Sequence, residues 1–279
     1  MSAIPSLPAT PTDSTPFAIQ TRDLTRAFGS TTALDHLNLT VTQGKIFGLL
    51  GPNGAGKSTT IKMLTTLLEP TSGTARVAGF DIVRDPSRVR RRIGYVPQSL
   101  SADGALTGFE NLRLSARLYG VPGPERLSRI EESLSFMNLE DSRNKLVKQY
   151  SGGMIRRLEL AQAMLHRPLI LFLDEPTIGL DPVARQTVWD RLHELNQTYR
   201  MTILITTHDM VEADNLCHEL ALLHRGTVAV TGKPAELKKN LGPRADLNDV
   251  FTHYAGSTIQ EGGNYRDAQQ SRRAASRHS

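Results

Sequence analysis

Two short segments of this 279-residue sequence combine glycine with side chains that suit phosphate. The first fits the pattern GxxxxGK[ST] in full, follows an apolar run and precedes an expected helix. In such a loop the glycines let successive backbone N–H groups converge on phosphate oxygens, the lysine adds a full charge, and the serine hydroxyl is placed to bind Mg²⁺. The segment consists of Gly51, Pro52, Asn53, Gly54, Ala55, Gly56, Lys57 and Ser58. On its own it indicates a nucleoside triphosphatase.

An apolar run at residues 169–173 ends in two acids, Asp174 and Glu175. Such a run is typical of a strand buried on both faces, and its carboxyl end opens at the sheet edge where ligands bind. Because successive strand side chains point in opposite directions, the two acids can serve different roles. We expect Asp174 to hold the Mg²⁺ shell and Glu175 to polarise the attacking water.

The second glycine segment is Ser151, Gly152 and Gly153, at the start of another expected helix. The serine can cap the helix, and the bare backbone amides can approach an oxyanion. Since the first loop already encloses its own γ-phosphate on one side, the simplest use of the second segment is to bind a nucleotide held by another subunit.

In this order and spacing, the sequence resembles the ABC ATPases from about residue 17 to residue 232. Residues 51–59, which add Thr59 to the loop, resemble their Walker A motif. Residues 169–175 resemble Walker B, and residues 151–153 resemble the signature motif. The resemblance implies an ATPase that uses ATP and Mg²⁺ and works as a dimer with each nucleotide between two subunits.

The resemblance also assigns roles to four further residues. Gln98 matches the Q-loop glutamine, which implies contact with the metal and a part in catalysis. His208 matches the switch histidine, which implies a catalytic contact with the γ-phosphate and the water. Asp181 matches the D-loop segment that joins the two nucleotide sites, and Phe28 stands where the family places an aromatic ring stacked on adenine.

The second glycine segment departs from the usual LSGGQ, since Tyr150 replaces leucine and Met154 replaces glutamine. This form resembles the daunorubicin-resistance branch, as does the ending at residues 247–251. That branch implies the ATP-hydrolysing motor subunit of an ABC-2 type exporter of drugs, lipids or polysaccharide. Its partners would be a separate integral membrane permease and a second ATPase subunit, either an identical or a related chain.

The hydrophobic pattern predicts the elements that position these segments. Strand-like alternation covers residues 17–42, with a turn at 28–30, and a capping-box pattern begins a helical stretch at Thr107. The other expected strands are 46–50, 169–173, 201–206, 220–223 and 228–230, and the other expected helices begin near 57, 152, 182, 210, 234 and 247. We therefore expect an α/β fold: a P-loop NTPase core with a mostly parallel sheet flanked by helices, an N-terminal antiparallel β-subdomain and an inserted α-helical subdomain.

Composition limits the organisation of the chain. We expect a disordered leader at residues 1–16, an ABC ATPase cassette at 17–232 with a helical insert at about 99–154, a short helical extension at 233–256 and a disordered basic tail at 257–279. The net charge is +5, and the single cysteine, Cys217, fits a reducing compartment. No apolar run approaches the ~20 residues that span a bilayer. We expect a cytoplasmic subunit that is peripheral to the inner face of the membrane and contacts it through the permease.

Two other functions remain as alternatives. ABC proteins that act on ribosomes carry two cassettes, and those that act on DNA insert long coiled coils, whereas this sequence has one Walker A motif and no heptad run. Nucleic acid is therefore not an expected partner. A regulatory module that binds ATP without turnover is opposed by the presence of Glu175 and His208.

Overall fold

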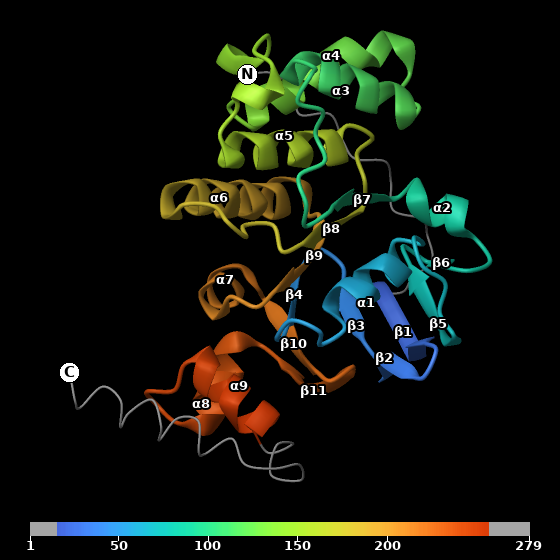
Figure 1. Cartoon of the computed structure of the whole chain (residues 1–279), viewed down its shortest axis with the longest axis vertical. Coiled ribbons are helices and arrows are strands. Elements are labelled where there is room, and N and C mark those ends of the chain that lie inside the picture. The colour runs from blue at the N-terminus through green and yellow to red at the C-terminus, as the bar shows by residue number, and fades with distance from the viewer. Residues whose placement is uncertain (1–15, 257–279) are drawn as a thin grey trace.

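The computed structural model describes residues 16–256, and two β-sheets form its centre (Figure 1). The first sheet is antiparallel, with the order β2-β1-β5-β6 and with β3 also paired to β1. Its strands are β1 (Phe17–Phe28), β2 (Thr31–Leu37), β3 (Thr40–Thr42), β5 (Ser72–Val77) and β6 (Phe80–Asp81). Gly29 makes the turn between β1 and β2 with a φ of 57°, a backbone conformation that glycine adopts at little cost.

The second sheet has the order β11-β10-β4-β9-β8-β7. The five strands from β10 to β7 are parallel, and β11 is antiparallel to β10. Their bounds are β4 (Ile46–Leu50), β7 (Ile93–Val96), β8 (Ile170–Asp174), β9 (Thr202–Thr207), β10 (Glu219–His224) and β11 (Thr227–Gly232). Parallel pairing brings the carboxyl ends of β4, β8 and β9 to one edge, where the sequence places the phosphate loop, the two acids and His208.

Helices cover the parallel sheet and extend beyond it at both ends (Figure 1). Near the sheet lie α1 (Lys57–Leu64), α2 (Pro86–Arg90), α6 (Pro182–Tyr199) and α7 (Met210–Leu216). One end holds α3 (Gly108–Leu118), α4 (Gly123–Phe136), the short turns η1 (Glu140–Ser142) and η2 (Val147–Gln149), and α5 (Gly152–Met164). The other end holds α8 (Pro234–Leu241) and α9 (Leu247–Gly256). The predicted capping box at Thr107 is confirmed, because its hydroxyl and the Glu110 side chain each bind the other residue's backbone N–H.

The side chains of the parallel strands alternate between two hydrophobic cores. In β4, Ile46 and Leu50 face the core built with helices α3 to α9. Phe47 and Leu49 face the core built with α1 and the antiparallel sheet. The expected α/β fold is thus confirmed, with α1 and the antiparallel sheet together covering the second face of the parallel sheet.

Two features differ from the sequence-based expectation or extend it. The helix expected to begin near residue 57 ends at Leu64, and Thr66 follows with a φ of 63°. Strands β5 to β7 were not predicted. The expected leader and basic tail lie outside the described residues, except for Pro16. Within the described chain, no helix is both long and apolar enough to cross a membrane.

Candidate active site

The phosphate loop leaves β4 and turns back tightly into α1. Gly51 lies so close to β10 that an added Cβ would be 2.3 Å from the Leu223 carbonyl oxygen. Gly56 has a φ of 105°, and an added Cβ there would be 2.7 Å from the Ala33 carbonyl oxygen. These two positions therefore require glycine for space and, at Gly56, for backbone conformation. The loop is therefore held between β10 of the parallel sheet and β2 of the antiparallel sheet.

Lys57 is buried at the first position of α1, with 5% of its surface exposed. Its Nζ atom donates to the carbonyl oxygens of Gly51 at 2.7 Å and Pro52 at 3.1 Å. It also lies 3.4 Å from Glu175 Oε1. The ammonium is thus fixed over the loop, at the positive end of α1, where both charges favour an anion.

Asp174 is the last residue of β8, and its carboxylate is hydrogen-bonded to α1 and to β9. Its Oδ1 atom accepts hydrogen bonds from the Ser58 hydroxyl at 3.1 Å and from the Thr206 hydroxyl at 2.6 Å. Asp174 is 3% exposed, so its carboxylate has a fixed orientation toward the start of α1. Burial of the Tyr95 side chain in β7 raises the pKa of its hydroxyl to about 12, and the nearby Asp174 carboxylate contributes to the same shift.

Glu175 follows Asp174 in a conformation that is rare for a side chain of its size, with a φ of 49°. Its backbone N–H donates to the Thr206 hydroxyl at 3.0 Å, which holds the turn. His208 Nδ1 lies 3.1 Å from Glu175 Oε1, and Gln98 Nε2 lies 3.5 Å from Glu175 Oε2. Two of the predicted residues, His208 and Gln98, therefore converge with the phosphate-loop lysine around the buried Glu175 carboxylate.

The donor set suits Mg²⁺ bound together with a triphosphate. Ser58 and Asp174 present two hard oxygen ligands in contact, and the Gln98 amide lies beside Glu175 Oε2. Among the described residues, no group of three His, Cys, Asp or Glu side chains gathers as a metal cage. Mg²⁺ commonly takes only one or two protein carboxylates and completes its shell with phosphates and waters, so the residues fit this metal.

Phe28 lies at the end of β1 with 48% of its surface exposed. The Arg26 guanidinium lies 4.5 Å from the centre of its ring and covers one face. The hairpin of β1 and β2 also carries Ala33, which contacts the phosphate loop at Gly56. An exposed aromatic ring on this hairpin is available to stack on a base.

The second glycine segment lies apart from this cluster. Ser151 caps α5, and its hydroxyl accepts a hydrogen bond from the Met154 N–H at 3.3 Å. Among the hydrogen bonds of residues 16–256, none joins Ser151 to the phosphate loop. Gly153 packs against α6, since an added Cβ would be 2.7 Å from the Ala184 Cβ. Asp181 caps that helix by accepting from the N–H groups of Val183 and Ala184. Ser151 and Asp181 therefore belong to one exposed surface.

Tyr150 has a structural role that explains its departure from leucine. Its ring is buried, and its hydroxyl donates to the Ser142 carbonyl at 2.7 Å. The side chain also fills the space beside Gly108, where an added Cβ would lie 2.2 Å from the tyrosine oxygen. Tyr150, the residue before Ser151, is thus packed against the start of α3.

A buried ion pair joins α5 to the segment that carries Gln98. Arg156 donates to the carbonyls of Pro97 at 2.8 Å and Gln98 at 2.9 Å, and it pairs with Glu159 at 3.0 Å. Glu159 in turn accepts from the Ser101 backbone N–H and from its hydroxyl, the latter at 3.1 Å. Arg156 is 2% exposed, so this pair binds four polar groups of one loop in a dry environment.

Sequence reasoning missed Arg156, Glu159 and Thr206. Thr206 was detectable in part, because it lies two residues before His208 at the carboxyl end of an apolar strand. No sequence signal identified the ion pair, since its significance depends on which loop packs against α5.

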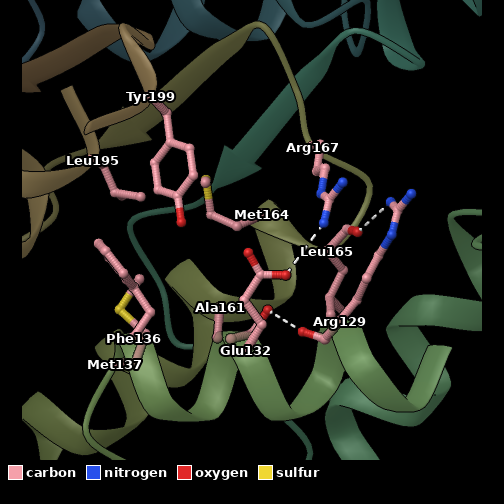
Figure 2. A pocket seen from close by; sticks show the side chains of 11 residues that line it. Arg129, Glu132, Phe136, Met137, Ala161, Met164, Leu165, Arg167, Leu195 and Tyr199 are labelled. Carbon is pink, nitrogen blue, oxygen red and sulfur yellow. Dashed lines mark hydrogen bonds and ion pairs between the residues drawn. The ribbon is translucent and has the colours of Figure 1, made fainter. Parts of the chain in front are cut away.

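A separate hollow lies between α4, α5 and α6 (Figure 2). Phe136, Met164 and Tyr199 form its apolar part, and Arg167 donates to Glu132 at 3.3 Å on its polar side. Its volume is about 40 Å³. Sites for small molecules measure roughly 300–1,000 Å³, so this hollow does not compete with the cluster around Glu175 as the functional site.

Comparison with known proteins agrees with this geometry. A sequence model of the ABC transporter family matches residues 34–178. The chain is 47% identical to the daunorubicin/doxorubicin resistance ATP-binding protein of Streptomyces peucetius, over 81% of this chain and 68% of that protein. It is 42% identical to the Nod factor export ATP-binding protein I of Cupriavidus metallidurans, over 78% of this chain and 72% of that protein.

A solved structure gives the same result for the fold. The dimeric ATP-binding cassette in a post-hydrolysis state, bound to ADP and phosphate, superposes with a TM-score of 0.69 and 28% identity. The match covers 77% of this chain and 98% of that cassette.

Proposed function

Since this chain belongs to the ABC transporter family, as an ATP-binding subunit that hydrolyses ATP, we propose that it is the motor of an exporter with a separate membrane permease. The observation that carries the proposal is the convergence of Lys57, Gln98 and His208 on Glu175. The exporter assignment is supported by relatives named for drug resistance and for Nod factor export. We assign the cargo to drugs, lipids or polysaccharide.

The residues divide the reaction between them. The loop amides and the Lys57 ammonium bind the phosphates, and Ser58 and Asp174 would hold Mg²⁺, which supplies charge stabilisation at the phosphates when bound. Glu175 orients the water and accepts its proton. His208 and Gln98 flank that carboxylate within about hydrogen-bond reach, so they fix its orientation and donate toward the transferred phosphoryl group.

The active unit is a head-to-tail dimer in which Ser151 of one subunit binds the γ-phosphate held by its partner. Two features support this arrangement. Ser151, Gly152 and Asp181 lie together on the surface and make no contact with their own phosphate loop through hydrogen bonds of the described chain. The same surface exposes Ile178 (43%) and Val183 (77%), whose apolar side chains a partner subunit would cover.

The permease binds the helical part of the chain. Of the eleven large apolar side chains that are more than 40% exposed in the described residues, five lie in this part and are available to a partner. They are Leu100, Leu114, Leu118, Tyr119 and Leu127. This contact would hold the subunit at the inner face of the cell membrane.

The proposal is tested by purifying the chain together with its membrane partner. We expect Mg-ATP hydrolysis by the complex and ATP-dependent loss of a fluorescent amphipathic cargo from membrane vesicles. A Leu118→Asp, Leu127→Asp double variant should retain ATP binding but no longer copurify with the permease. Copurification with ribosomes or DNA in place of a membrane protein would contradict the proposal.

A further inference from the structure

Glu212 is a buried carboxylate that the reaction proposed above does not use. It lies in α7, four residues after His208, and is 2% exposed. Its Oε1 atom accepts a hydrogen bond from the Thr177 hydroxyl at 2.6 Å and another from the Trp189 indole N–H at 3.1 Å. Both donors are buried as well, so any rotation of the carboxylate would leave two polar groups unpaired in the interior.

The two donors come from different parts of the candidate site. Thr177 lies two residues after Glu175 and begins the turn that leads to Asp181, since its carbonyl accepts from the Leu180 N–H at 3.2 Å. Trp189 lies in α6, the helix that Asp181 caps. We call residues 177–189 the Asp181 segment. One oxygen atom of Glu212 therefore joins α7, the helix that follows His208, to both ends of this segment.

A second contact between α6 and α7 is more exposed. Asp209 accepts from the Glu212 N–H at the start of α7 and also receives a hydrogen bond from Arg185 of α6 at 2.8 Å. The Arg185 and Asp209 side chains are 32% and 30% exposed. Since ion pairs in contact with water constrain a structure weakly, the buried Glu212 contact is the firmer of the two links.

We propose that Glu212 is a positioning residue that makes the Asp181 segment and His208 move as one unit. This inference rests on the proposed function, in which Asp181 lies at the dimer surface and His208 beside Glu175. Thr177, two residues after Glu175, connects Glu212 to the candidate site, whereas Trp189 connects Glu212 to α6. Arrival of the partner subunit at Asp181 would then set the orientation of His208 within the same chain.

Two matched substitutions separate a positioning role from a purely structural one. Thr177→Val and Trp189→Phe each remove one hydrogen bond to the same oxygen while keeping most of the volume of the side chain. We expect Thr177→Val to lower the kcat of the full-length chain for ATP about ten-fold with KM changed less than two-fold. We expect Trp189→Phe, with a comparable fall in Tm, to lower kcat less than three-fold. Thr177→Ser, which restores the hydroxyl, should recover most of the rate.

The chain has one tryptophan, so intrinsic fluorescence reports the Glu212 contact directly. We expect saturating Mg-ATP to shift Trp189 emission in the wild-type chain, and we expect Thr177→Val to abolish that shift. Equal losses of kcat in Thr177→Val and Trp189→Phe, a rise in KM alone, or an unchanged nucleotide response of Trp189 in Thr177→Val would overturn the inference. Failure of the proposed function is distinct, because the wild-type chain would then copurify with ribosomes or DNA in place of a membrane protein, whatever the kcat of these variants.

Discussion

The two glycine segments of this chain have similar chemistry but opposite surroundings. The phosphate loop is enclosed, and the polar groups of Lys57 and Ser58 already have partners within the chain. The segment that begins at Ser151 is exposed at the start of α5, and its hydroxyl bonds only to its own helix among the described residues. In the proposed dimer, the first segment supplies one half of the nucleotide site from within its own chain, and the second supplies the other half to the partner subunit.

The sharpest test of the enclosed segment is Lys57→Ala. A unit charge pair at 4 Å contributes roughly 4 kcal/mol at an effective dielectric near 20, which corresponds to about a 10³-fold change in affinity. We expect ATP binding by equilibrium titration to weaken by about this factor and turnover to disappear. Lys62→Ala, on an exposed face of the same helix, is the control and should bind normally. Unchanged turnover in Lys57→Ala would refute the role of the loop.

Glu175→Gln separates binding from chemistry in the enclosed segment. We expect kcat to fall by about 10³-fold, because the base is lost, while ATP binding remains. Size-exclusion chromatography in saturating Mg-ATP should then show an accumulated dimer. Glu236→Gln, a surface substitution in α8, should leave both properties unchanged. A strictly monomeric Glu175→Gln chain under these conditions would argue against the shared site.

Ser151→Arg tests the exposed segment. The bulky cation should block the surface that faces the partner, so we expect turnover to fall by about 10²-fold, the scale of losing one anion-stabilising donor. ATP binding to the monomer should stay within two-fold of wild type. Ser128→Arg, on the exposed face of α4, provides the matched control. Loss of ATP binding in the Ser151→Arg monomer would show that this segment belongs to its own site.

The smallest expected effect is that of Phe28, a half-exposed residue that belongs to neither glycine segment. Stacking contributes about 0.5–1.5 kcal/mol, so Phe28→Ala should raise the KM for ATP roughly 2- to 13-fold with little change in kcat. Phe80 carries a similar cation–π contact, with Arg88 at 4.4 Å from its ring centre. Phe80→Ala is therefore the matched control, and it should not alter nucleotide affinity. A rise in the KM of Phe80→Ala equal to that of Phe28→Ala would remove the adenine assignment from Phe28.

Local sequence patterns predicted the strands and helices that carry the candidate site residues. They did not predict strands that form only because they pair with a strand distant in the sequence. The phosphate loop and the acidic strand end have strong signals, because glycine spacing and a continuous apolar run each restrict the backbone. Strand β7 has no such signal, since it follows an arginine-rich turn and is only four residues long. It is a strand because it pairs with β8 at the sheet edge.

The same limit applies within the site. Asp174 and Glu175 were recognised as a pair with separate roles, but Thr206, which contacts both, lies 32 and 31 residues away along the chain. The Glu212 contact joins two helices and a turn and is equally invisible to a local pattern. Only the parallel order of β8 and β9 brings these groups together.

The ion pair of Arg156 and Glu159 has a consequence for how two nucleotides are consumed. Arg156 is attached to the carbonyls of Pro97 and Gln98, and Ser151 begins the same helix five residues earlier, about 7.5 Å along its axis. In a head-to-tail pair, any shift of Gln98 that accompanies loss of a phosphate on one side displaces the serine that faces the opposite nucleotide. In the dimer proposed above, loss of a phosphate at one site would therefore weaken the contact between Ser151 and the nucleotide at the other site.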